Sequence, residues 1–135
     1  MRTMPTKLHA VLDYFIALLS ILSPLIFGFG EGGNETLLPI SFGLLIILYS
    51  FFSDYEFGFT RQIPMWAHLR IDQMAGLLMA ASPWIFRFYG SVYLPHVLLG
   101  LSLIISSLAT GNDVTQVIQF VKRPWGRIFG TVSNQ

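Results

Sequence analysis

The sequence predicts an all-α membrane protein with four transmembrane helices, arranged as two tandem, parallel two-helix repeats. Three observations support this: 53% of residues are hydrophobic against 11% charged, long segments lack any charge, and one sequence pattern occurs twice. Soluble domains usually contain about 25% charged residues, so the composition indicates largely apolar surroundings. The predicted units are a first repeat at 1–53, a cytoplasmic interfacial connection at 54–65, a second repeat at 66–112 and a tail at 113–135.

Four segments carry no Asp, Glu, Lys or Arg: 14–30, 37–53, 73–86 and 88–112. A helix needs roughly 20 residues to cross the hydrocarbon core, so each segment can span once its flanks are added. The third is the shortest and reaches full length only with the turn at 68–72. That turn contains Arg70 and Asp72, which places two charged groups at or inside the membrane boundary.

The basic residues are distributed unevenly in this topology. One side receives seven of the eight, leaving Arg87 on the other side with Glu31 and Glu35. The positive-inside rule therefore predicts that both termini are cytoplasmic. A net charge of +1 with no basic run gives no indication of a nucleic-acid partner. The absence of cysteine excludes disulfides and thiolate metal sites.

An ungapped repeat supports the division into two units. With an offset of 59 residues, segment 9–29 aligns with 68–88 over 21 positions. Duplication of a two-helix unit explains this alignment, and an even number of spans gives both copies the same orientation. The repeated polar and proline positions are His9 with His68, Asp13 with Asp72, Ser23 with Ser82, and Pro24 with Pro83.

The tail after residue 112 has apolar residues at 114, 117, 118 and 121, the spacing of one helical face. This pattern predicts a short C-terminal interfacial helix that stops before Pro124.

The tripeptide Ser82-Pro83-Trp84, near the far end of the first helix of a two-span unit, resembles the hallmark of the SPW-repeat family of small bacterial integral membrane proteins. The resemblance covers roughly Lys7 to Thr110, although Leu25 replaces the tryptophan in the first copy. It implies a multi-pass protein of the bacterial inner membrane and no particular activity.

The repeated His-x3-Asp pattern is the main candidate site. Residues four apart share one helix face, about 5.4 Å along the axis. A carboxylate in hydrocarbon costs at least about 2.5 to 3.5 kcal/mol, so such groups normally face the protein interior with partners. One hypothesis is a symmetric polar or ion site that binds a metal, relays protons or meets a polar ligand. The alternative, which we prefer to any single chemistry, is that each His pairs with its own Asp or a helix terminus and holds the bundle together. The four residues are His9, Asp13, His68 and Asp72.

Pro24 and Pro83 each remove a backbone hydrogen bond and free a carbonyl one turn earlier. Ser23 and Ser82 are adjacent hydroxyls that can donate to that carbonyl or to a neighbouring helix. We expect these Ser-Pro pairs to lie where helices end, with a transport site made from broken helices as the alternative.

His96 begins the fourth predicted helix on the outer side, and its repeat counterpart is Ile40. We expect an interfacial polar residue there, with an axial haem ligand as the alternative.

No catalytic signature is present, so we do not expect an enzyme. The preferred function is a structural or assembly module that forms homo-oligomers or supports a membrane complex. The alternatives are a small ion or proton channel or transporter using the His/Asp pairs, and a metal- or haem-binding subunit. We expect no cofactor, with a metal ion or haem as the alternative. The lipid bilayer is the expected principal partner.

Overall fold

The computed structural model of the protein describes residues 4–110. Within them lie four α-helices and no strand longer than an isolated bridge. The helices are α1 (Thr6–Ile26), α2 (Asn34–Phe51), α3 (Met65–Ile85) and α4 (Leu94–Thr110). This confirms the all-α class. The predicted interfacial helix in 113–135 lies outside the described residues.

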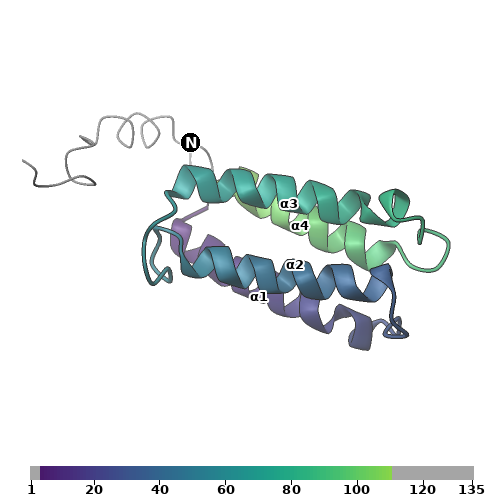
Figure 1. The fold of residues 1–135 in the computed structure, drawn as a ribbon. Helices are drawn as coiled ribbons and strands as arrows, with labels where there is room; N and C mark the ends of the chain where they lie inside the picture. Colours follow the sequence, from purple (N-terminus) through teal and green to yellow (C-terminus); the bar gives the residue numbers. More distant parts are fainter. Residues whose placement is uncertain (1–3, 111–135) are drawn as a thin grey trace, which may run out of the picture.

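The helices form two antiparallel hairpins that pack side by side (Figure 1). Helix α1 packs on α2 and α3 on α4, and the hairpins meet through α1 with α4 and α2 with α3. Helices α1 and α3 therefore lie at diagonally opposite corners. Both begin at the end that contains the connection 52–64, which we call the connection end, and the loops 27–33 and 86–93 lie at the other end (Figure 1).

Prolines delimit α1 and α3 in the same way. Each helix follows a proline, Pro5 or Pro64. Proline has no N–H, and at the start of a helix this costs nothing because an N–H there would have no carbonyl partner within the helix. Both helices have 21 residues, and α3 starts 59 residues after α1, since 65 minus 6 is 59. Each ends two residues after its internal proline, Pro24 or Pro83. The Ser-Pro pairs thus lie near helix ends, at the opposite end from the connection.

The serine of each Ser-Pro pair restores the hydrogen bond that its proline removes. Ser23 Oγ donates to the carbonyl oxygen of Ser20 at 2.8 Å, and that carbonyl is the one Pro24 leaves free. Ser82 Oγ does the same for Met79 at 2.7 Å. Of the two partners that the sequence left open, the freed carbonyl and a neighbouring helix, these serines bond to the carbonyl, so the backbone is satisfied within each helix.

Close backbone approach joins the two helices of each hairpin. A Cβ on Gly76 would lie 2.6 Å from the Gly100 carbonyl oxygen, and one on Gly43 would lie 2.6 Å from the Ala17 carbonyl oxygen. No side chain fits at these separations. Glycine therefore permits the tight packing that small residues give helices in membranes.

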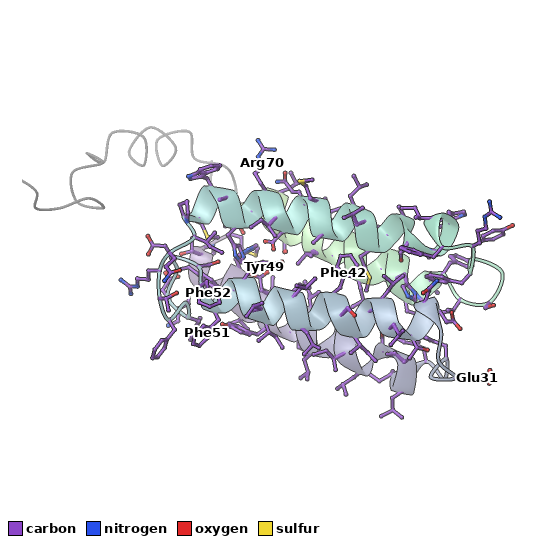
Figure 2. All side chains as sticks on the ribbon, in the orientation of Figure 1. Glu31, Phe42, Tyr49, Phe51, Phe52 and Arg70 are labelled. Carbon is purple, nitrogen blue, oxygen red and sulfur yellow. The ribbon has the colours of Figure 1, made fainter. Side chains whose placement is uncertain are left out.

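The bundle has an apolar exterior and a partly polar interior. Each helix carries large apolar side chains that are more than half exposed, for example Leu18, Leu48, Leu77 and Ile105. Figure 2 shows side chains projecting outward from the bundle along its length. Helices α1 and α2 are long and apolar enough to cross a membrane, whereas α4 is apolar but has 17 residues. Helix α3 is less apolar because its first half contains His68, Arg70 and Asp72.

Candidate functional site

The four residues of the repeated His-x3-Asp pattern converge at the connection end of the bundle. His9 and Asp13 come from α1, and His68 and Asp72 come from α3. All four side chains have 0% exposure. One nitrogen or oxygen atom from each lies within 4.8 Å of those from the other three. We call this group the His–Asp centre.

Nitrogen and oxygen atoms alternate around the His–Asp centre. The shortest contacts cross between α1 and α3: His68 Nε2 lies 2.8 Å from Asp13 Oδ2, and His9 Nε2 lies 3.0 Å from Asp72 Oδ2. The contacts within one helix are longer, 3.3 Å for His9 with Asp13 and 3.4 Å for His68 with Asp72. Each histidine therefore lies closer to the aspartate of the diagonal helix than to the aspartate four residues along its own helix, contrary to the expectation that each His pairs with its own Asp.

A hydroxyl from α4 fixes the ring of His9. Thr110 Oγ1 donates its single hydrogen to the Ser106 carbonyl oxygen at 2.8 Å. Thr110 Oγ1 also lies 3.0 Å from His9 Nδ1, and with its hydrogen already used it accepts from that nitrogen. His9 Nδ1 therefore carries a proton, and its Nε2 faces the carboxylates.

The same arrangement holds His68. Ser53 Oγ donates to the Tyr49 carbonyl oxygen at 2.7 Å and accepts from His68 Nδ1 at 2.7 Å. His9 is thus oriented by a hydroxyl of the opposite hairpin, and His68 by a hydroxyl of the connection that is bonded to the end of α2. All four helices contribute to holding the two rings in place.

The outer carboxylate oxygens differ between the two aspartates. The Tyr49 hydroxyl, which lies between the hairpins (Figure 2), donates to Asp72 Oδ1 at 2.5 Å. Asp13 Oδ1 is buried and has no hydrogen-bond partner among the described residues. The centre therefore retains one unsatisfied acceptor, on the side where no tyrosine reaches it.

These hydrogen bonds determine what the centre can do chemically. With both Nδ1 atoms protonated, a neutral histidine presents only a lone pair at Nε2. Two lone pairs and two carboxylates would then face one another with no hydrogen between them. An uncompensated buried charge is strongly destabilising. A proton in each nitrogen–oxygen pair, carried by the imidazole or by the carboxyl group, or one metal ion shared by all four atoms would remove this conflict.

Aromatic rings enclose His68. The rings of Tyr49 and Tyr55 lie 5.1 and 5.2 Å from it, and the His9 ring lies 5.4 Å away. Tyr55 belongs to the connection and is buried, and burial raises the pKa of its hydroxyl, which therefore stays neutral. The connection thus packs against the centre.

Sequence reasoning did not identify Tyr49, Ser53, Tyr55 or Thr110 as site residues. Their position in the sequence was one available signal. Ser53 comes just after the end of α2 and Thr110 ends α4, so both lie at the depth at which α1 and α3 begin and carry their histidines.

The remaining predicted residues lie away from the centre. His96 is buried at the other end, where its Nε2–H donates to the Glu35 carbonyl oxygen at 3.1 Å and its ring lies 4.9 Å from that of Phe88. Trp84 is 54% exposed on the exterior. Neither residue takes part in the His–Asp centre.

Comparison with known proteins identifies a family. A family model described as SPW repeat domain matches residues 7–110, which include nearly all of the four-helix bundle. No curated protein and no solved structure matches the chain.

Proposed function

The chain belongs to the SPW repeat family, and from that premise we propose that it is a four-span bacterial inner-membrane protein whose His–Asp centre holds a cation. The family has no established activity, so the proposal is argued from the site. It includes duplication of a two-helix unit, because the repeated residues occupy matching places in both hairpins.

Two features support a membrane location for all four helices. Large exposed apolar side chains cover every helix, which in water would be an aggregation hazard and in lipid is the expected exterior. Ionisable side chains of the centre face the interior. Arg70 is exposed, but it lies near the connection end, where a long side chain reaches the headgroups. The uneven distribution of basic residues favours cytoplasmic termini.

One observation carries the functional proposal: two Nε2 atoms and two Oδ2 atoms alternate in a fully buried group whose outer nitrogens are occupied by hydroxyls. A cation between nitrogen and oxygen, either a proton in each pair or a metal ion, compensates the buried carboxylates. Because the cation is shared between α1 and α3, it also fixes the two hairpins relative to each other.

Nitrogen NMR of the histidines tests the proposal. In the purified chain labelled with 15N-histidine, we expect both centre rings to show either imidazolium or metal-bound Nε2 resonances. His96, assigned by its loss in His96→Gln, serves as the internal reference. Neutral rings with free Nε2 lone pairs at His9 and His68 would refute the proposal.

A second candidate function is assembly, as a module that oligomerises or supports a membrane complex. The observation that favours it is the exposed aromatic surface of the connection, where Phe59 is 80% exposed and stacks on Phe51 at 5.2 Å. An aromatic face outside the helices suits contact with another membrane protein. Native mass spectrometry that detects only monomer would count against this function.

The ion or proton path is less favoured, because none of the four centre side chains has any exposed surface. Proton flux in proteoliposomes that disappears in Asp13→Asn/Asp72→Asn would restore it.

A further inference from the structure

The spacing of the His–Asp centre suits a small transition metal. Neighbouring nitrogen and oxygen atoms are 2.8, 3.0, 3.3 and 3.4 Å apart. In a tetrahedral zinc site with bonds of about 2.0 to 2.2 Å, neighbouring ligand atoms are about 3.4 Å apart. The two contacts within one helix match this value, the two across the diagonal are shorter, and all four atoms lie within 4.8 Å of one another. Small shifts of the side chains would therefore bring the four atoms to coordination distances.

We propose that the cation is one divalent transition metal ion of the zinc class, bound by Nε2 of two histidines and Oδ2 of two aspartates. This inference rests on the proposed function, since it specifies which cation the centre holds. The ligands are His9, Asp13, His68 and Asp72.

Ligand chemistry favours this class over the alkaline-earth ions. Imidazole nitrogen suits zinc and its transition-metal neighbours, whereas calcium takes about six to eight oxygen ligands. The centre offers two nitrogens and two inner oxygens. Magnesium usually keeps several waters, and a fully buried group of four residues offers little room for them.

Charge balance favours a divalent ion. Two aspartates contribute two negative charges, and two neutral histidines contribute none. One divalent ion makes the group neutral, whereas a monovalent or trivalent ion leaves a net charge buried inside an apolar bundle.

Surrounding contacts match those of metal-bound histidine. A ligating imidazole almost always donates its other N–H to an acceptor, and that contact fixes the ring. His9 does so to Thr110, and His68 does so to Ser53. Both acceptors are held by their own bonds to backbone carbonyls.

The unsatisfied oxygen distinguishes a metal from protons. If two protons neutralise the centre, Asp13 Oδ1 remains a buried acceptor without a partner among the described residues. A metal ion bound by Asp13 Oδ2 would also lie close to Oδ1 of the same carboxylate, and this second, weaker contact would satisfy that atom. The orphaned oxygen therefore favours the metal.

Zinc binding by the full chain in mild detergent tests the inference. After removal of bound metal by a chelator, the protein is titrated with Zn²⁺, and with Ca²⁺ in parallel, and bound metal is measured per chain. We expect one Zn²⁺ per chain, no Ca²⁺, and a shift of both centre Nε2 resonances. We expect Thr110→Val to weaken zinc binding about 10- to 100-fold.

The matched pair His68→Gln and His96→Gln separates specific from adventitious binding, since both replace a buried histidine. We expect His68→Gln to lose the zinc and His96→Gln to keep it; equal binding by both would overturn the inference. No zinc binding with imidazolium at both centre rings would overturn the metal but leave the cation proposal standing. Neutral, metal-free rings would overturn both, and this readout uses wild-type protein, so it does not depend on a variant folding.

Discussion

His9 Nε2 on α1 and Asp72 Oδ2 on α3 are 3.0 Å apart, although their helices occupy diagonal corners of the bundle. Helix packing alone does not bring diagonal helices together. Here the polar side chains bridge the diagonal, and they do so between residues 63 apart in sequence. The two hairpins are thereby tied at one end by contacts that neither hairpin can make alone.

Asp72→Asn should destabilise the protein strongly, because it removes one charge from a buried group and leaves its partner uncompensated. Breaking such a pair costs about 3 to 5 kcal/mol. The control is Asp54→Asn, whose partner Arg61 is 4.0 Å away with both side chains exposed, and such pairs contribute about 0 to 1 kcal/mol. Unfolding in detergent, followed by circular dichroism, measures both. Equal losses would mean that the centre is not a special source of stability.

Tyr49→Phe should destabilise the protein by about 1 to 3 kcal/mol, because it leaves Asp72 Oδ1 buried without its donor. Tyr89→Phe is the matched control, since Tyr89 is 56% exposed. Thermal unfolding of both variants checks the difference. A Tyr49→Phe protein as stable as wild type would show that this hydrogen bond contributes little.

Gly76→Ala should destabilise the α3–α4 hairpin by about 1 to 3 kcal/mol, as overpacking usually does. The added methyl would lie 2.6 Å from the backbone oxygen of Gly100, and a backbone atom cannot rotate aside. Gly90→Ala, with nothing within 4 Å, is the control. If both variants unfold at the same temperature, the helices are free to separate slightly at Gly76.

The sequence predicted the helical hairpins well because its signals are local. Apolar length, the Ser-Pro pairs and the prolines before α1 and α3 act within a few residues of each helix end. The centre was only partly predictable. An offset of 59 placed His9 and His68 at equal depth, but whether each pairs with its own Asp depends on how the hairpins dock. Tyr49 was missed because the sequence of an apolar helix does not distinguish a tyrosine that bonds to a buried carboxylate from one that only packs.

Zinc binding should weaken as the pH falls, because protons compete with the metal for imidazole nitrogen and carboxylate oxygen. A zinc-dependent rise in unfolding temperature should therefore be largest at neutral pH and disappear at acid pH, and a chelator should abolish it. The control is His96→Gln, which retains all four proposed ligands and should keep the same dependence. A zinc effect that is constant with pH would point to binding elsewhere.

Cysteine labelling tests the four-span topology, and the absence of natural cysteine makes single substitutions unambiguous. Glu31 in the first hairpin loop, Ser91 in the second and Gln62 in the connection are all exposed. In intact cells, a membrane-impermeant maleimide should label Glu31→Cys and Ser91→Cys but reach Gln62→Cys only after lysis, because the loops lie at the end opposite the connection. Ser91→Cys is the decisive position, since α3 is the helix with charges in its first half. If only Glu31→Cys is labelled, α3 and α4 do not cross the bilayer. The His–Asp centre would then lie at the membrane surface rather than within a four-span bundle.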